Sequence, residues 1–563
     1  MPQRAMFWTI AGLAVAAAVV HSWVLRWTCD DAFISIRYAM HLVEGHGLVF
    51  NLDPSEAPVE GYTNFLWTLW LALGLWLGCT GDAIETWGSV WGTLAHGGVV
   101  WLLAAIAWRH SGGRARVPIA ACGYAAIHHA ASLAPAGLET ALFVLLVTAM
   151  LRACLQPGTV AGALCLGLLG TAAAMTRPDG ALPVAMAGLF VLADARRWRS
   201  WRPVLAYALP FLVVFVPYLL WRHSYYGYWL PNTFYAKSGS DPFVSAGVHY
   251  VVDFVRCYWP LLLAFLALPL GLARPGQEVG ARRPWLALAA FVGSYLAFVL
   301  WVGGDFMFGR FLLPLLPALM LGLDFLLARV PAAWPAPLVA AILVLGCVFR
   351  VEPPGLDNPH NDVSDNRRIS FLPIAGIPLR EAFHDVADDL RSLWAGLEVR
   401  ISIAGGHANV ATRTGVPVAI ECAAGLTDAH IARLPVPVRG KRGHDKPRDP
   451  AYLARRRVHF MLETNFEGEF GKVETWRDIT FPTAPLPFPM RLVTWDKALM
   501  RELKRRAPNI TFTDFEAFLD GYLADLPNKS KDQVRADFAK FEPFYFAHND
   551  DQVRRAKFAA FLQ

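Results

Sequence analysis

The chain has 563 residues, of which 55% are apolar, 13% are aromatic and only 17% are charged, and its mean hydropathy is +0.36. Because soluble domains carry about 25% charged residues, this composition excludes a cytosolic enzyme and a disordered chain and indicates a polytopic membrane protein. The net charge of +6 includes no long run of Lys or Arg, which argues against a nucleic-acid partner. The eight cysteines have no CxxC spacing, so we expect neither a disulfide framework nor a zinc site.

Apolar stretches recur through the first 350 residues, each close to the ~20 residues that cross a bilayer as a helix. We expect about 11 spans, at 6–25, 86–107, 117–134, 138–155, 159–175, 180–193, 203–221, 257–273, 285–302, 311–328 and 335–350. The first lacks the small-residue cleavage site of a signal peptide and is interpreted as an anchor. Residues 62–78 are also apolar, but a crossing there would break the alternation of the loops, so we expect an interfacial or re-entrant segment.

The arginines predict the orientation of these spans, because positive loops face the cytoplasm. Three connecting segments are arginine-rich, at 109–116, 194–202 and 274–283, and we place them in the cytoplasm. The loops near 28–60, 135–139, 222–256 and 303–310 then face outward, as does everything after Arg350. The C-terminal part is thus predicted to lie outside the cytoplasm.

The composition changes after Arg350, where charged residues become frequent and no spanning stretch remains. Segments 399–405 and 416–422 alternate like strands, and 382–394, 496–506, 514–525 and 531–541 have helical periodicity. The chain therefore divides into a membrane domain at 1–350 and a mixed α/β extracytoplasmic domain at 351–563.

Ionisable residues gather at span ends on the predicted outer face, where a charge at membrane depth is costly and needs a reason. The set comprises Asp30, Asp31, Glu60, Glu139, Arg177, Asp179, Lys237, Asp305 and Arg310, with the polar but uncharged Asn232 near Lys237. Separate loops that place acids and bases on one face of a helical bundle predict a functional site there.

Asp30 and Asp31 carry the sharpest hypothesis, because they begin an amphipathic segment, AFISIRYAMHLVEG. One Asp is enough to cap a helix, and the other is then available for another role. Carboxylates in a partly dry cleft acquire raised pKa values that suit a general base. The simpler alternative is that the pair only caps the helix.

The three cations Arg177, Lys237 and Arg310 can each reach the lipid headgroups from a span end, yet together they predict an anionic ligand such as a phosphate. Glu139 either pairs with one of them or contributes to the site. His46 either belongs to this site or merely follows a helix C-terminus before Gly47. The rings near Tyr62 can stack on a sugar.

The motifs DDAFISIRYAMHLVEGHGLVFN, PVEGYTNFLW, GLETALF, TRPDGAL, PNTFYAKSG and GGDFMFGRFLLP follow in an order that resembles the GT-C glycosyltransferases. More narrowly, the chain resembles the group of the mycobacterial terminal (β-linking) arabinofuranosyltransferase. The resemblance extends from about residue 28 to about residue 460 and includes AAGLTDAHIARLP and GKRGHDKPRDPAYL.

This resemblance implies a GT-C-like membrane domain that transfers a sugar from a polyprenyl-phosphate donor to a glycan acceptor outside the cytoplasm. It implies decaprenyl-phosphate arabinose as the donor, Asp30 as the base and Asp31 as its partner, with a divalent cation (Mg, Mn or Ca) as a further expectation at this pair. The expected donor-binding set is Arg37, His46, Glu60, Tyr62, Glu139, Arg177, Asn232, Lys237, Asp305 and Arg310. In the outer domain, His407, Asp428 and His444 are candidates for binding the acceptor, although a folding role suits each equally well.

Three alternatives stay open at this stage. One is a GT-C transferase for another sugar, or for a protein or lipid acceptor. Another is a transporter or flippase with an outer ligand domain, although the charges lie at span ends and no inverted repeat is visible. The third is a sensor that binds glycan without catalysis. Whether transfer would retain or invert the anomeric configuration is not decided by the sequence.

Overall fold

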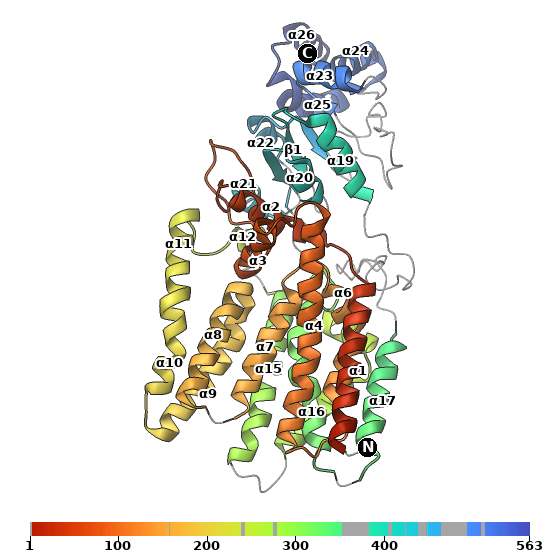
Figure 1. Ribbon diagram of the computed structural model, residues 1–563. Coiled ribbons are helices and arrows are strands. Elements are labelled where there is room, and N and C mark those ends of the chain that lie inside the picture. The colour runs from red at the N-terminus through yellow and green to blue at the C-terminus, as the bar shows by residue number, and fades with distance from the viewer. Residues whose placement is uncertain are drawn as a thin grey trace.

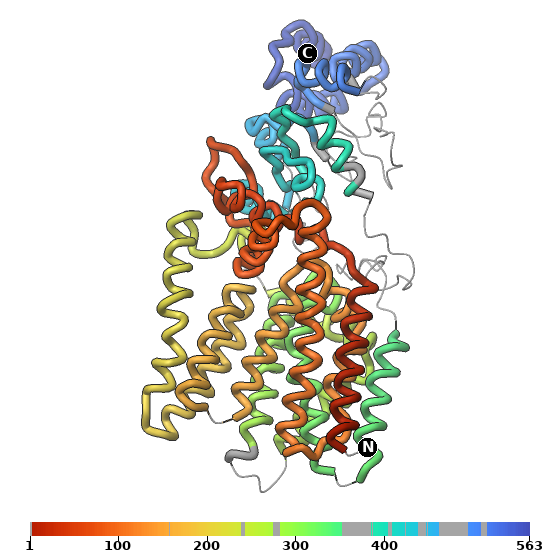
Figure 2. The backbone as a smooth tube through the Cα atoms, viewed as in Figure 1, coloured from red at the N-terminus to blue at the C-terminus, as the bar shows by residue number. Residues whose placement is uncertain are grey.

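The computed structural model describes residues 3–156, 158–237, 242–273, 279–330, 332–351, 382–403, 408–422, 424–436, 446–447, 449–462, 493–507 and 513–563. A bundle of long apolar helices forms one part, and a smaller α/β part stands on one end of it (Figure 1). The N-terminus lies at the far end of the bundle, whereas the C-terminus lies at the tip of the α/β part (Figure 2).

Among the residues that the structure describes, six helical segments are long and apolar enough to cross a membrane. They are α1 (Gln3–Val24), α4 (Asp82–His110), η1 with α9 (Pro178–Gly180 and Ala181–Trp198), α10 to α11 (Arg202–Tyr226, including the π-helical turn η2, Phe211–Phe215), the Arg282–Val302 part of α15 (Val279–Val302), and η3 with α16 (Arg310–Leu315 and Leu316–Leu327). The pair α13 (Val244–Cys257) and α14 (Leu261–Leu272) is also apolar enough when taken together, but it is bent by 108°, the geometry of a broken span or of a re-entrant loop. The protein is therefore a multi-pass membrane protein.

The count of about 11 spans is not confirmed. Three predicted spans correspond to apolar helices of 14 to 17 residues, α7 (Thr140–Cys154), α8 (Val160–Thr176) and α17 (Pro335–Val348). The stretch 117–134 is divided into α5 (Ile119–Ala125) and α6 (His128–Leu133), so one continuous helix there was a wrong prediction. The His128 and His129 pair interrupts that apolar stretch, and His129 hydrogen-bonds Tyr258 at 2.6 Å.

The connections at 109–116 and 194–202 lie at the end of the bundle away from the α/β part, as does the start of α15, which carries Arg282 and Arg283 (Figure 1). Gln3 at the start of α1 donates to the carbonyl of Arg114 at 2.7 Å, and Arg283 pairs with Asp194 at 2.5 Å. The described parts of these segments therefore lie at one end of the bundle, and their location in the cytoplasm stays a prediction.

Two helices from the first eighty residues lie between the bundle and the α/β part. They are α2 (Asp30–Val43) and α3 (Phe65–Trp76), and α12 (Asn232–Ala236) lies near them (Figure 1). At 12 residues α3 is too short to cross a bilayer, as expected for an interfacial segment. Phe33, Ile36 and Trp67 share one buried apolar cluster with Ile401 and Val410 of the α/β part, so these helices connect the two parts.

The α/β part contains a three-stranded parallel sheet of order β2-β1-β3, formed by β1 (Arg400–Ile403), β2 (Val418–Glu421) and β3 (Phe460–Leu462). A second, two-stranded sheet pairs β4 (Val493–Thr494) with β5 (Thr513–Asp514). The helices are α19 (Ala382–Trp394), α20 (Ala408–Thr414), α21 (Ala429–Ala432), α22 (Pro450–Arg455), α23 (Lys497–Arg506), α24 (Phe515–Ala524), α25 (Lys531–Phe541) and α26 (Gln552–Leu562), with the turns η5 (Leu526–Asn528) and η6 (Glu542–Phe546). The predicted strands and helices of this region are confirmed to within two residues.

Candidate active site

The segment before α7 lies directly beneath the start of α2. The amide of Cys29 donates to the carbonyl of Ala136 at 2.9 Å, and the indole of Trp67 in α3 donates to the carbonyl of Gly137 at 2.8 Å. Gly137 has φ +77°, and a Cβ there would lie 3.0 Å from that of Ala32. Only glycine permits both this backbone conformation and this close approach. The two predicted acidic positions, 30–31 and 139, are thereby brought to one place.

Glu139 is the centre of a buried charge cluster at this end of the bundle. Its Oε1 accepts from Arg177 at 3.1 Å and from Arg310 at 3.0 Å, and its Oε2 accepts from the Asn64 amide at 2.9 Å. Arg177 also forms a two-pronged pair with Asp179, at 2.8 and 3.2 Å. Asn64, Arg177 and Arg310, which are far apart in the sequence, therefore meet at one carboxylate.

Arg310 extends the cluster toward a further acid. Its guanidinium lies 3.7 Å from Oδ2 of Asp305 and donates to the hydroxyl of Thr140 at 3.3 Å. The cluster then holds three carboxylates, Glu139, Asp179 and Asp305, against the two guanidinium groups of Arg177 and Arg310. Its formal charge is −1, so both arginines are already neutralised by carboxylates.

Asp30 and Asp31 have different surroundings although they are adjacent. The two carboxylate oxygens of Asp30 accept from the backbone amides of Ala408 and Asn409, at 3.1 and 3.0 Å, so Asp30 receives the amino end of α20. Asp31 has no hydrogen bond or ion pair with the described part of the chain, and its charge acts on Arg310 and on Cys29. Asp30 joins the two parts of the protein, whereas Asp31 interacts with the charge cluster through the electrostatic effect of its charge on Arg310.

A second polar group lies beside the first and connects the bundle with the α/β part. Glu60 is buried and pairs with Arg222 at 2.6 Å, and its carbonyl accepts from the amide of Asn232 at 3.1 Å. The Asn232 side chain donates to the carbonyls of Gly425 and Leu426, at 2.8 and 2.9 Å. These contacts hold α12 against the segment before α21.

Arg37 and Tyr62 of the predicted donor-binding set are buried and engaged within the protein. The Arg37 guanidinium donates to the carbonyls of Phe50, Ala411 and Val416, which again joins α2 to the α/β part. The hydroxyl of Tyr62 lies 3.3 Å from that of Tyr226, and its ring contacts Tyr38. Both side chains support the interface between the two parts.

Lys237 and His46 are exposed at the surface. Lys237 follows α12 and has no ion pair with the described residues, which distinguishes it from Arg177 and Arg310. Of the three predicted acceptor residues, Asp428 is buried, caps α21 and accepts from Tyr452 at 2.6 Å, which is a folding role. His407 and His444 lie outside the described residues.

The described residues do not form a metal centre at the aspartate pair. No group of three His, Cys, Asp or Glu side chains among them is arranged to hold a metal ion, and amide donors already engage both oxygens of Asp30. The residues present therefore do not fit the divalent cation expected at Asp30 and Asp31.

Three members of this region were missing from the predicted site: Asn64, Thr140 and Arg222. Asn64 lies four residues after Glu60 in the motif VEGYTNF, and Thr140 directly follows Glu139. Polar residues beside a predicted charged one in an otherwise apolar segment are a usable signal. Arg222 gives a weaker one, because an arginine at a span end is common.

Similarity to known proteins supports the resemblance noted in the sequence, although no family model matches the chain. The chain is 30% identical over 357 residues to the terminal β-(1→2)-arabinofuranosyltransferase of Corynebacterium glutamicum, covering 57% of this chain and 51% of that protein. It is 32% identical over 328 residues to the enzyme of the same name from Mycobacterium tuberculosis, with coverages of 52% and 51%.

Solved structures with a similar course of the chain include ArnT from Cupriavidus metallidurans bound to undecaprenyl phosphate, with a TM-score of 0.46 and 16% identity over 93% of this chain and 94% of that one. Another is the oligosaccharyltransferase AglB from Archaeoglobus fulgidus in complex with an inhibitory peptide and a dolichol-phosphate, with a TM-score of 0.48 and 10% identity over 86% and 74%. The chain spans about half the length of both arabinofuranosyltransferases, to which it is similar in sequence.

Proposed function

We propose that the protein is a GT-C-like membrane glycosyltransferase that moves arabinofuranose from a polyprenyl-phosphate donor to a glycan acceptor outside the cytoplasm. The observation that carries this proposal is the sequence similarity to two arabinofuranosyltransferases, which covers more than half of the chain. The charge cluster beneath the start of α2 supports it, because it places a carboxylate where the bundle meets the α/β part.

The site belongs at a lipid–water boundary because a polyprenyl chain cannot leave the bilayer, each buried CH₂ contributing about 0.8 kcal/mol. The Asp30–Asp31 end of the bundle carries the α/β part, and the opposite end carries the arginine-rich segments (Figure 1). By the positive-inside rule, the α/β part lies outside the cytoplasm of a bacterial cell, in the cytoplasmic membrane.

In the proposed reaction the acceptor hydroxyl attacks the anomeric carbon, the bond from that carbon to the phosphate oxygen breaks, and polyprenyl phosphate leaves as an anion. The hydroxyl proton passes to a carboxylate. Asp31 suits this role better than Asp30, the base predicted from the resemblance, because both oxygens of Asp30 are engaged by the amides of α20. Asp30 then positions the α/β part over the site.

The leaving phosphate needs positive charge, since its ester anion is stable without a proton. Arg177 and Arg310 are paired with carboxylates, so their main role is to orient Glu139 and the loops around it. Lys237 is the better candidate for the donor phosphate, because it is exposed and has no ion pair within the described ranges. No step is routed through a metal ion.

The α/β part is proposed to hold the acceptor glycan, because it covers the end of the bundle where Asp31 lies. Asp30, Arg37 and Asn232 hold the α/β part against the bundle. In the proposed enzyme these contacts fix the distance between a bound glycan and the donor.

The test compares Asp31→Asn with Asp30→Asn in the purified full-length protein, given decaprenyl-phosphate arabinose and an arabinan oligosaccharide. Loss of a general base lowers the rate by about 10²- to 10⁴-fold, so we expect Asp31→Asn to lose transfer while its melting temperature is kept. Asp30→Asn should keep a higher rate of sugar transfer than Asp31→Asn. Wild-type transfer by Asp31→Asn would contradict the assignment of the base.

A donor panel tests the sugar separately. Polyprenyl-phosphate mannose and a second pentose are supplied under the same conditions. Transfer of mannose alone would replace the arabinose proposal by another GT-C activity, and transfer of no sugar would favour the sensor or transporter alternatives.

A further inference from the structure

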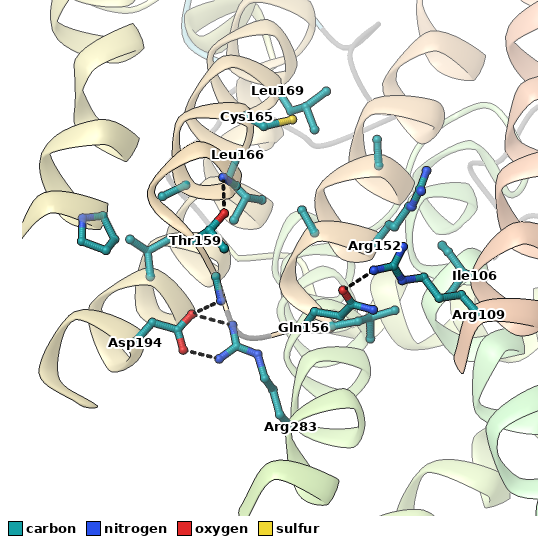
Figure 3. A pocket seen from close by; sticks show the side chains of 18 of the residues that line it. Ile106, Arg109, Arg152, Gln156, Thr159, Cys165, Leu166, Leu169, Asp194 and Arg283 are labelled. Carbon is teal, nitrogen blue, oxygen red and sulfur yellow. Dashed lines mark hydrogen bonds and ion pairs between the residues drawn. The ribbon is translucent and has the colours of Figure 1, made fainter. Parts of the chain in front are cut away.

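A cavity of about 560 Å³ lies at the end of the bundle opposite Asp31. Its wall is formed by the last turns of α4 and α7, the first turns of α8, and side chains of α9 and α15, as Figure 3 shows. Arg109, Arg152 and Arg283 line it together with Gln156 and Asp194. The proposed transfer reaction uses none of these residues.

The cavity has an excess of positive charge. Arg283 is fully engaged, since it pairs with Asp194 at 2.5 and 2.9 Å and donates to the carbonyl of Cys154 at 2.9 Å. Arg109 donates only to the neutral amide oxygen of Gln156, at 2.9 Å, and Arg152 has no hydrogen bond or ion pair with the part of the chain described. Three arginines against one aspartate give a formal charge of +2.

This charge balance is the reverse of that in the Glu139 cluster, where carboxylates outnumber arginines. Arg109 and Arg152 line one cavity and have no carboxylate partner among the described residues, because Asp194 pairs with Arg283. Their charges repel each other, and an anion bound between them removes that electrostatic cost. The amino end of α8 borders the same cavity through Gly158 and Thr159, and its helix dipole adds partial positive charge. The polar side of the cavity therefore suits a phosphate.

The remaining wall is apolar and suits a hydrocarbon chain. Leu102, Ile106, Leu166 and Leu169 line it. Basic pockets between membrane helices on the cytoplasmic side are typical sites for anionic lipid headgroups. A cavity with phosphate-binding arginines on one side and leucines on the other matches a lipid better than a soluble anion.

We propose that this cavity binds an anionic glycerophospholipid, whose headgroup phosphate lies between Arg109 and Arg152 and whose acyl chain lies along α4 and α8. The sugar donor is not the proposed occupant, because the last turn of α4 lines the cavity, and that end of α4 is away from α2, which carries Asp31 (Figure 1). The lipid would hold the ends of α4, α7 and α8 together.

The test is native mass spectrometry of the full-length protein released from nanodiscs that contain phosphatidylglycerol and phosphatidylcholine in equal amounts. We expect the wild type to retain one phosphatidylglycerol selectively. Arg109→Gln with Arg152→Gln should lower that retention at least tenfold. The matched control is Arg196→Gln with Arg197→Gln, which removes two exposed arginines from the last turn of α9 at the same end of the bundle.

Equal loss in both double variants, or equal retention of both lipids by the wild type, would overturn the proposal. Competition distinguishes the sources of phosphate. Displacement by sn-glycerol 3-phosphate at a similar concentration would identify a soluble-anion site, and preferential displacement by polyprenyl phosphate would identify a carrier site. Either result would contradict binding of a glycerophospholipid. Matching melting temperatures of the three proteins show that the variants are folded.

Discussion

At the scale of single residues, the cations of the predicted site differ in burial and in pairing. Arg177 is buried between Glu139 and Asp179, whereas Lys237 is exposed. Two cations of one predicted site therefore have different surroundings, one paired and buried and the other exposed. Substitution of the two cations should affect different measurements.

Arg177→Gln should destabilise the protein, because it leaves the buried Asp179 without its cation and leaves Glu139 paired with Arg310 alone. Breaking a buried pair in this way costs about 3–5 kcal/mol. The measurement is thermal unfolding in detergent, with Arg197→Gln as a control on the same type of side chain at the surface. An unchanged melting temperature for Arg177→Gln would show that the cluster adds little to stability.

Lys237→Ala should leave the melting temperature unchanged, because an exposed cation contributes little to folding. It should weaken binding of the sugar donor, because the donor phosphate loses its proposed cation. A hydrogen bond to a charged group is worth about 1.5–3 kcal/mol, which corresponds to an increase in donor KM of about tenfold or more. Kinetics with varied donor concentration measure this effect. A change in kcat alone would argue that Lys237 acts on something other than donor binding.

At the scale of elements, α2 is the connection on which the site depends. Its amphipathic pattern predicts a helix, and the structure has one from Asp30 to Val43. Its polar face is not solvated, however, since Asp30 and Arg37 bond to backbone groups of the α/β part. A helix that lies between two domains uses its charged residues as contacts.

Arg37→Met should loosen the contact between α2 and the α/β part, because three buried carbonyls lose their donor. Each unsatisfied buried group costs about 1–3 kcal/mol. Hydrogen exchange in α20 and β2 should accelerate, while exchange in the bundle helices α4 and α7 stays at the wild-type rate. Uniform acceleration across the whole chain would indicate global destabilisation instead.

At the scale of the whole molecule, the α/β part is attached to the bundle by ion pairs that depend on pH. Asp53, in the loop after α2, pairs with Arg400 at 2.8 Å and with Arg456 at 3.2 Å. Burial by itself would raise the pKa of Asp53, but hydrogen bonds from Ser55 and the charge of Arg400 outweigh it and lower this pKa to about 2.

Because the folded-state pKa of Asp53 lies below the value of about 3.9 for an unfolded chain, its contribution to stability is complete above pH 4. That contribution is lost as the pH falls toward 2. We expect protease cleavage between the two parts to increase over this range, and Asp53→Asn to show the increase already at neutral pH. Identical pH profiles for variant and wild type would contradict this role.

The sequence by itself determined the membrane class, the change of composition after Arg350 and the positions of most helices, because hydrophobic length and periodicity are local properties. It also identified Glu139, Arg177, Asp305 and Arg310, since charges in apolar segments are conspicuous. The number of spans was not determined in this way, because the sequence does not show where an apolar stretch is interrupted. The stretch 117–134 is interrupted before His128 and His129, and His129 finds a hydrogen-bond partner in Tyr258, which is far away in the sequence.

Tertiary structure alone decided what each charge contacts. The two adjacent aspartates have the same local sequence signal, and only the position of α20 gives Asp30 two amide donors and leaves Asp31 directed to Arg310. The separation of Arg177 from Lys237, and the surplus arginines at the opposite end, likewise depend on contacts between residues far apart in the chain. Electrostatic interactions act through space, so a sequence shows which charges exist but not which of them are neutralised.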